Sequence, residues 1–296
     1  MPPDARPSLT DVIPPRAALT AALTAAAMLA FAANSLLCRA ALVGEHADAA
    51  SFTTLRLASG ALVLWLLAKS RGGASPAPRV AWGSAIALFA YAMLFSLAYL
   101  RIAAGTGALL LFAAVQLTMI GAGLRGGERP RAPEWLGLAV SLAGLVLLTR
   151  PGTSRPDPTG AALMLGAGAA WGVYSLRGRG AADAVAANAA SFTRAVPLAL
   201  ATSAVFGLWA SARLTPAGTL LALASGGVTS GLGYAVWYAA LRGLSATRAA
   251  IVQLSAPPLA AFGGVLVLGE IVSLRLLVAS VVILGGIALA ITGHRR

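Results

Sequence analysis

Charged side chains are scarce in this chain of 296 residues. Only 10% of the residues are charged, while 58% are hydrophobic and the mean hydropathy is +0.82. A soluble domain carries roughly 25% charged residues. So few charges cannot cover a surface in water, and lipid must therefore be the solvent of this chain. The scarcity excludes a soluble catalytic or binding domain.

Acids, histidines and cysteines are fewer still. The nine acids and two histidines all fall in predicted loops or at predicted helix ends. We therefore expect no proton relay within the membrane and no carboxylate there for a cationic drug, since both need an ionisable group at that depth. The single Cys38 excludes an intramolecular disulfide. No cysteine pair, paired metal motif or phosphate-binding glycine loop is present, so we expect no metal, cofactor or catalytic residue.

Apolar stretches of membrane-spanning length are abundant. A span needs roughly 20 mostly apolar residues. Ten stretches qualify, at 17–43, 50–69, 80–100, 104–124, 134–150, 159–177, 187–209, 217–241, 246–268 and 272–292. The sequence therefore predicts an all-α integral membrane protein with ten transmembrane helices.

The second half of the chain repeats the first at an offset of 140 or 141 positions. The matching pairs are Ser35/Ser175, Leu36/Leu176, Arg39/Arg179, Leu100/Leu241, Arg101/Arg242, Thr106/Thr247, Ala108/Ala249, Gly123/Gly264 and Gly144/Gly285. Five helices per repeat is an odd number, so the second repeat enters the membrane from the opposite side and the repeats are inverted. We predict a cytoplasmic tail at 1–16, a first five-helix repeat at 17–150, an inter-repeat loop at 151–158 and a second repeat at 159–293.

The net charge of +13 reflects topology. With the N-terminus inside, most of the 22 basic residues lie on the inner side, which is the positive-inside bias. We therefore expect a multi-pass protein of the cell inner (plasma) membrane with both termini cytoplasmic. Nucleic-acid binding is not expected, because no soluble segment interleaves basic and aromatic residues.

Three segments carry a family resemblance: the run from Trp237 to Glu270, which contains Pro257-Pro258, and the stretches 99–107 and 127–130. They resemble the drug/metabolite transporter superfamily, EamA type, and the resemblance covers nearly the whole chain. It implies a ten-helix, two-repeat carrier whose central cavity is lined mainly by the spans at 17–43, 80–100, 104–124, 159–177, 217–241 and 246–268. Within the superfamily the chain is most similar to the YddG-type aromatic amino-acid exporters.

Aromatic and amide side chains within the spans are the candidate substrate-binding residues. Rings four residues apart share a helix face, and a buried amide needs a polar partner or a wet cavity. The candidates are Asn34, Ser35, Tyr91, Phe95, Tyr99, Gln116, Trp171, Tyr174, Tyr234, Trp237, Tyr238 and Gln253. Rings with a few polar groups suit a neutral zwitterion with an apolar side chain. Helix packing is the alternative role for each ring.

Two arginines and a proline pair complete the candidates. Arg56 and Arg194 lie within spans, near the same place in each repeat. Either they gate the path and attract a substrate carboxylate, or they snorkel and bond helix-end carbonyls, and we favour the second role. Pro257 and Pro258 are expected to break their helix, because proline lacks an N–H. The first repeat has Gln116 in place of Pro257, so we expect the two gates to move differently.

The sequence thus predicts a secondary transporter that exports small neutral metabolites, above all aromatic and other apolar amino acids, by alternating access between the repeats. The lack of a mid-membrane acid favours facilitated movement. A carrier of a phosphorylated sugar, nucleotide sugar or drug is the alternative. A membrane enzyme is disfavoured, since no base lies near the mid-membrane hydroxyls, and so is a non-transporting scaffold. The expected partners are an amino-acid substrate and the lipid bilayer, and the expected state is a monomer.

Overall fold

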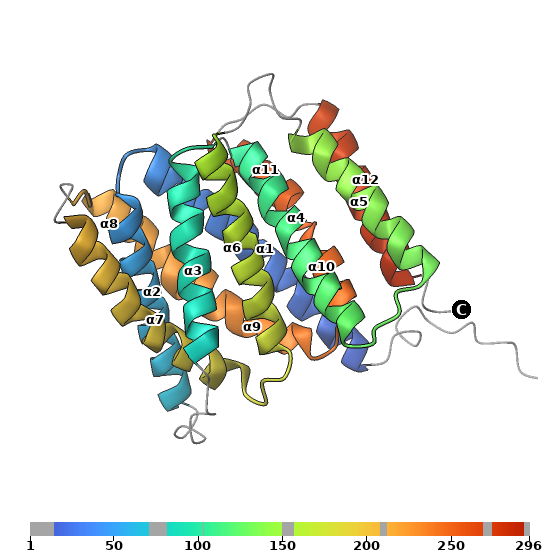
Figure 1. Ribbon diagram of the computed structural model, residues 1–296, viewed down its shortest axis with the longest axis horizontal. Helices are drawn as coiled ribbons and strands as arrows, with labels where there is room; N and C mark the ends of the chain where they lie inside the picture. Colours follow the sequence, from blue (N-terminus) through green and yellow to red (C-terminus); the bar gives the residue numbers. More distant parts are fainter. Residues whose placement is uncertain are drawn as a thin grey trace, which may run out of the picture.

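The computed structural model describes residues 15–70, 82–102, 104–149, 157–207, 212–268 and 274–292, and these residues are almost entirely helical (Figure 1). The helices are α1 Pro15–Val43, α2 Ala49–Ser70, α3 Trp82–Tyr99, α4 Ala104–Arg125, α5 Ala132–Thr149, α6 Pro158–Gly178, α7 Ala184–Gly207, α8 Pro216–Ala224, η2 Ser225–Leu232, α9 Gly233–Leu241, α10 Ala246–Gln253, α11 Ala256–Leu268 and α12 Leu274–Thr292. Because α8, η2 and α9 are continuous and α10 leads into α11, they form ten helical stretches within the described residues. The predicted fold of ten helices is confirmed.

Six of the described helical segments are long and apolar enough to cross a bilayer, by length and composition alone. They are Arg16–Val43, Ala49–Ser70, Trp82–Tyr99, Ala184–Gly207, Pro216–Leu241 and Leu274–Thr292. Two shorter apolar helices cover Leu110–Arg125 and Ala132–Leu148. Many large apolar side chains on these helices are exposed, as expected of a surface that faces lipid.

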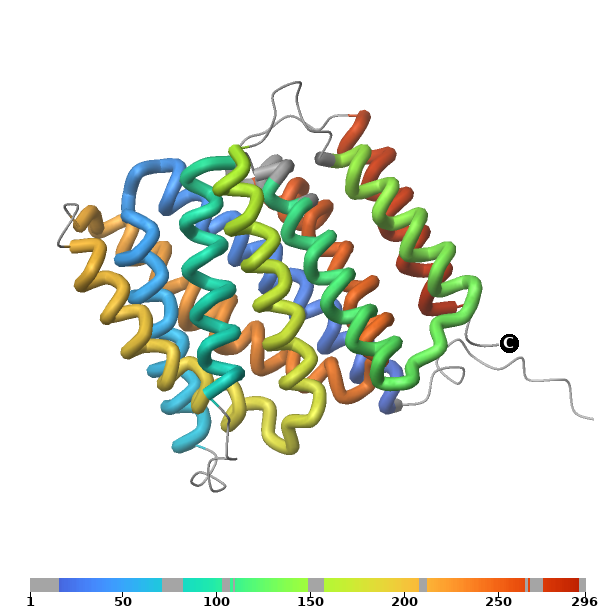
Figure 2. Tube along the Cα trace, viewed as in Figure 1, coloured from blue at the N-terminus to red at the C-terminus, as the bar shows by residue number. Residues whose placement is uncertain are grey.

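The two repeats are inverted and packed into each other. α1 begins where α6 ends, and the two helices run in opposite directions through the bundle (Figure 2). We call the end of the bundle where α1 begins the Pro15 end, and the end where α1 finishes the Val43 end. The α3·α6 contact is matched by α1 against η2 and α9, and the α4·α6 contact by α1 against α11. α2 packs on its own counterpart α7, and α5 on α12, at the two sides of the bundle (Figure 1).

Glycines allow the closest of these approaches. A Cβ atom on Gly226 of η2 would overlap the carbonyl oxygen of Arg56 and the Ser59 hydroxyl on α2. On the other side of the bundle, Gly137 of α5 lies directly against the backbone of Gly286 in α12. Small residues are the usual contact in lipid, where hydrophobicity no longer drives helices together. They hold the paired repeats at backbone-to-backbone distance.

Two helices of the second repeat are irregular. Residues Ser225–Leu232 form a π-helix, a form often found at functional sites. The helix of span 246–268 is interrupted at Leu254 and Ser255, just before Pro257 and Pro258. The break predicted from the proline pair is therefore present, and it begins earlier than Pro257 because a proline in a helix removes the hydrogen bond to the carbonyl four residues before it and clashes with that carbonyl. By contrast, α7 runs through Pro197 without interruption.

Candidate functional site

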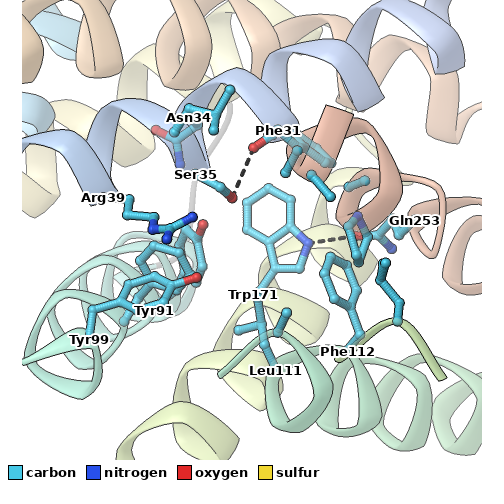
Figure 3. Close-up of a pocket in the computed structure, with 18 of the residues that line it drawn as sticks. Phe31, Asn34, Ser35, Arg39, Tyr91, Tyr99, Leu111, Phe112, Trp171 and Gln253 are labelled. Carbon is cyan, nitrogen blue, oxygen red and sulfur yellow. Dashed lines mark hydrogen bonds between the residues drawn. The ribbon is translucent and has the colours of Figure 1, made fainter. Parts of the chain in front are cut away.

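A cavity of about 250 Å³ lies between the repeats (Figure 3). Its wall includes Arg39 near the end of α1, Tyr99 at the end of α3 and Leu148 near the end of α5, so the cavity extends from the bundle centre toward the Val43 end. Most of the wall comes from the helices that the family resemblance implies. The lining residues are Phe31, Asn34, Ser35, Leu36, Arg39, Tyr91, Phe95, Tyr99, Ala108, Leu111, Phe112, Leu148, Trp171, Tyr234, Gln253, Ala256, Pro257, Ala260 and Ala261.

Trp171 of α6 is at the centre of an aromatic cluster that forms one side of the cavity. Its ring centroid lies 5.1 Å from that of Phe31, 4.9 Å from that of Tyr91 and 4.7 Å from that of Tyr234. These rings come from four different helices, and the edge-on and tilted geometries are those that aromatic pairs prefer. Trp171 is 5% exposed. The cluster therefore gives the cavity a rigid apolar wall.

The rings of α3 extend this wall toward the Val43 end. Tyr91 and Phe95 have centroids 5.5 Å apart, and Phe95 and Tyr99 have centroids 4.6 Å apart. The stack follows the four-residue spacing seen in the sequence, because residues four apart lie on one helix face. All three rings line the cavity.

Polar groups are few and come mainly from α1 and the broken helix. The indole N–H of Trp171 donates to Oε1 of Gln253 at 2.6 Å (Figure 3), and Nε2 of Gln253 donates to the carbonyl of Ala249 at 3.0 Å. Oδ1 of the Asn34 side chain accepts from the hydroxyl of Ser225 in η2 at 2.7 Å. The Ser35 hydroxyl donates to the carbonyl of Phe31 at 3.2 Å. Both irregular helices thus contribute to the polar network at the cavity.

Arg39 is the one charged side chain among the lining residues that the structure describes. Figure 3 shows its guanidinium on the same side of the cavity as the hydroxyls of Tyr91 and Tyr99. These lining residues include no aspartate, glutamate or histidine. Among the described lining residues, the cavity therefore has one cationic group, beside tyrosine rings.

Arg56 lies behind the cavity wall. It is 1% exposed, and it donates to the Ser230 hydroxyl at 2.9 Å and the Tyr234 hydroxyl at 2.6 Å. Its guanidinium carbon is 5.6 Å from the centre of the Tyr91 ring, within reach of a cation–π interaction. Arg56 therefore holds two rings of the cavity wall. Arg194, which lies near the same place in the second repeat, is half-buried and donates to the carbonyl of Ala190 in its own helix at 3.3 Å.

Several other predicted site residues lie outside the cavity. Gln116 donates to the Ala250 carbonyl at 2.9 Å, and the Tyr174 hydroxyl donates to Oδ1 of Asn188 at 2.6 Å. Trp237 donates to the Ser175 hydroxyl at 3.1 Å. The Tyr238 hydroxyl donates to the Tyr174 carbonyl at 3.0 Å. These residues, together with Arg194 and Pro258, are absent from the lining.

The sequence interpretation missed several lining residues, above all Phe31, Arg39 and Phe112. Phe31 precedes the repeat match at Ser35, and at the same offset of 140 it corresponds to Trp171. Arg39 matches Arg179 at the same offset, and it lies near the end of the span at 17–43. The repeat therefore contained a signal for the first two. Phe112 has no comparable signal, since a lone ring in an apolar helix is ordinary.

The Pro15 end of the bundle is closed by contacts between the repeats. Glu128, in the loop after α4, accepts from the backbone N–H groups of Ala246 and Thr247 at 2.8 and 3.2 Å, at the start of α10. It also accepts from the Thr247 hydroxyl at 3.1 Å and pairs with Arg179 at 3.3 Å. We call this cluster of Glu128, Thr247 and Arg179 the latch. The repeat counterpart of Glu128, Glu270, lies outside the described residues.

The latch keeps its carboxylate ionised. Burial alone would raise the pKa of Glu128, but the donors of Ala246 and Thr247 and the charge of Arg179 outweigh burial and lower it. Arg248, one residue further along α10, pairs with Glu134 of α5 at 3.1 Å. Two carboxylates of the first repeat thus bind the first turn of α10, whose positive helix end favours them.

Comparison with known proteins gives a consistent result. The profile of a family described as "EamA-like transporter family" matches residues 18–150 and again 158–292. A Pseudomonas aeruginosa protein described as "Uncharacterized protein PA1977" is 53% identical over 270 residues, which cover 91% of this chain and 93% of that protein. A solved structure described as "Crystal structure of protein" superimposes with a TM-score of 0.79 at 20% identity, covering 94% of this chain and 98% of its own. At that identity the structural likeness concerns the fold alone.

Proposed function

The chain belongs to the EamA-like transporter family, and from this premise we propose that it exports small neutral metabolites, above all aromatic and other apolar amino acids. In this proposal the substrate binds in the central cavity, which is lined by Asn34, Ser35, Tyr91, Trp171 and Gln253 of the predicted site. Residues 17–150 and 159–293 act as the two halves that exchange access.

The observation that carries the proposal is the pairing of aromatic walls with one arginine. Seven aromatic rings line the cavity, and Arg39 is the charged residue among the described lining residues. The guanidinium binds a carboxylate in a planar, charge-assisted geometry, and ring faces attract an ammonium group and pack against an apolar side chain. An aromatic amino acid presents all three groups.

Size and charge favour this substrate over the alternatives. A volume of about 250 Å³ is below the range of roughly 300–1,000 Å³ typical of drug-sized ligands, which suits a small solute better than a nucleotide sugar. A phosphorylated sugar carries up to two charges on its phosphate and would need more than one cation. A cationic drug would need a carboxylate, and none is found among the described lining residues.

The two ends of the bundle support an alternating-access cycle. The cavity extends toward the Val43 end, whereas the latch closes the Pro15 end. We place the protein in the inner membrane as a monomer with both termini cytoplasmic, so this conformation faces outward. Because the described lining residues include no acid or histidine, the movement is proposed to be facilitative and to follow the substrate gradient.

The test is exchange in liposomes with three matched solutes. Liposomes loaded with unlabelled phenylalanine take up labelled phenylalanine, phenethylamine, which lacks the carboxylate, or phenylpropionate, which lacks the ammonium. Replacing Arg39 by Gln should raise the KM for phenylalanine by roughly 10- to 100-fold, because a hydrogen bond to a charged group contributes about 1.5–3 kcal/mol. Phenethylamine uptake should be unchanged.

Arg101→Gln is the control. Arg101 lies at the same end of the bundle, is largely exposed and pairs with Asp157 at 3.8 Å. Equal effects of Arg39→Gln and Arg101→Gln would contradict the proposed site. Exchange of phosphorylated sugars in place of phenylalanine would keep the fold and overturn the substrate. Uphill transport driven by an imposed pH gradient would overturn the facilitative mechanism.

A further inference from the structure

A second hollow lies away from the central cavity. It is a groove of about 660 Å³ bordered by α1, α12 and the α10–α11 pair. Leu259 of α11 lines this groove, whereas Pro257 and Ala260 of the same helix line the central cavity. The groove therefore uses another face of α11, and it is separate from the substrate path.

The groove is charged at one end and apolar along its length. Arg16 and Arg248 lie at the Pro15 end. The hydroxyl groups along the groove are bonded within their own helices: Thr20 to the Arg16 carbonyl at 3.0 Å, Thr24 to the Thr20 carbonyl at 2.7 Å and Ser255 to the Val252 carbonyl at 2.8 Å. They offer little to a polar ligand, so beyond its charged end the groove suits hydrocarbon.

One guanidinium nitrogen of Arg248 makes no hydrogen bond to the described residues. Its Nε donates to Glu134 at 3.1 Å, while its Nη2 is buried and has no hydrogen-bond partner among the described residues. A buried donor without a partner is costly. Because Arg248 lines the groove, a turn of its guanidinium would offer this donor to an anionic oxygen there. Arg16 supplies a positive charge that Glu134 does not neutralise through a direct pair.

The length of the groove matches one leaflet of a bilayer. Along α1 it runs from Arg16 to Leu29, which at about 1.5 Å per residue is roughly 20 Å. Half of a hydrocarbon core of about 30 Å, plus one headgroup region, gives a similar depth. We propose that the groove binds one anionic phospholipid, with its phosphate at Arg16 and Arg248 and an acyl chain along α1 toward Leu29.

The bound lipid has a defined effect on the transporter. Arg248 lies in the first turn of α10, next to the Thr247 of the latch. A phosphate on Arg248 therefore holds α10 where the latch holds it, and the acyl chain supports Leu259 on the outer face of α11. The lipid stabilises the conformation that is closed at the Pro15 end, whatever the substrate.

The test compares phosphatidylglycerol with phosphatidylcholine on the purified full chain. Native mass spectrometry counts the retained lipid, and the thermal midpoint in detergent reports stabilisation. Phosphatidylglycerol should be retained and should raise the midpoint more than phosphatidylcholine. Arg16→Gln should weaken retention by about fivefold, the effect of one arginine at an anionic surface. Ala25→Trp, which fills the groove, should abolish the retention.

Two variants serve as matched controls. Arg125→Gln removes an exposed charge at the same end but outside the groove, and Ala26→Trp adds the same ring to α1 beside the groove. Both should behave like the unaltered protein. Equal retention of the two lipids, equal loss in Arg16→Gln and Arg125→Gln, or full retention in Ala25→Trp would each overturn the proposal. So would destabilisation by Ala25→Trp that is independent of phosphatidylglycerol, because the effect would then not depend on the lipid.

Discussion

The repeats have matching helices, but they differ in regularity. In the first repeat α3 and α4 are uninterrupted, whereas their counterparts are the π-helical stretch α8–η2–α9 and the broken pair α10–α11. Both distortions lie at polar contacts near the cavity. Ser225 of η2 donates to Asn34, and Gln253, the last residue of α10, accepts from Trp171. The first repeat thus provides a regular platform of rings, and the second provides backbone distortion that brings polar groups to the site.

The difference also bears on how the bundle moves. α10 is a helix of eight residues, attached at one end through the Leu254–Ser255 break and at the other through the latch. α4, its counterpart, has no such break. A few residues at the ends of helices absorb the dihedral changes of a hinge. We therefore expect opening at the Pro15 end to occur by movement of α10 against α11, with α4 moving as one body.

The largest expected effect comes from crowding the π-helix. Gly226→Val should lower the free energy of unfolding by about 3 kcal/mol, the upper part of the usual range for overpacking, because the side chain overlaps the Arg56 carbonyl and Ser59. Gly227→Val is the matched control, since its Cβ meets the Val63 side chain at 3.1 Å and no backbone atom. Thermal unfolding in detergent measures both. If both variants cost the same, the close contact of η2 with α2 is unimportant.

The next comparison sets Arg56 against Arg194. Arg56→Leu should cost about 2 kcal/mol, because the buried Ser230 and Tyr234 hydroxyls lose their donor. Arg194→Leu should change stability by less than about 0.5 kcal/mol, as is usual for a residue near the surface, since its bond is to its own helix. The midpoints of thermal unfolding of the two variants in detergent provide the readout. Equal losses would mean that the two arginines have equivalent roles, as their places in the repeats suggest.

The third prediction concerns the break itself. Pro257→Ala restores an N–H that can bond to the Gln253 carbonyl and makes α10–α11 resemble α4. We expect the exchange rate to fall about tenfold, or about 1.4 kcal/mol in the barrier, with the folded state no less stable. Pro197→Ala is the control, because α7 runs through this proline without interruption. Unchanged exchange in Pro257→Ala would show that the hinge does not depend on this proline.

The sequence predicted the helices well and the distortions in part. Apolar length and the repeat were sufficient for the ten helices, and Pro257-Pro258 located the break. The π-helix left no comparable mark, because Ser225 and Ser230 stabilise it through contacts with Asn34 and Arg56 that are distant in sequence. Nor could spacing on one helix decide whether a ring faces the cavity or a neighbour. Tyr234 and Tyr238 are four residues apart, yet just the first lines the cavity.

The smallest expected effect tests the latch. Ala108 lines the cavity at the Val43 end, and its repeat counterpart Ala249 is fully buried near the Pro15 end. With Cys38 replaced by Ser, a cysteine at 249 should react slowly with a water-soluble thiol reagent and one at 108 quickly. Glu128→Gln should raise labelling at 249 about fivefold, equivalent to about 1 kcal/mol, the upper value for partly exposed ion pairs. Glu45→Gln, which removes the exposed pair with Arg213 at the other end, should leave labelling at 249 unchanged.

The pH dependence of that labelling has a defined sign. The hydrogen bonds and charge around Glu128 lower its pKa from the ordinary 4.5, so the latched state binds the proton less readily than an open state in which Glu128 is solvated. The contribution of the latch is therefore complete above pH 4.5 and is lost as the pH falls below it. The ratio of labelling at 249 to labelling at 108, taken at the same pH so that the pH dependence of the reacting thiolate cancels, should be flat from about pH 5 to 8 and rise in more acidic solution, with no such rise in Glu128→Gln. A rise near neutral pH would mean that another group controls the Pro15 end, and that the short α10 is not held by its carboxylate.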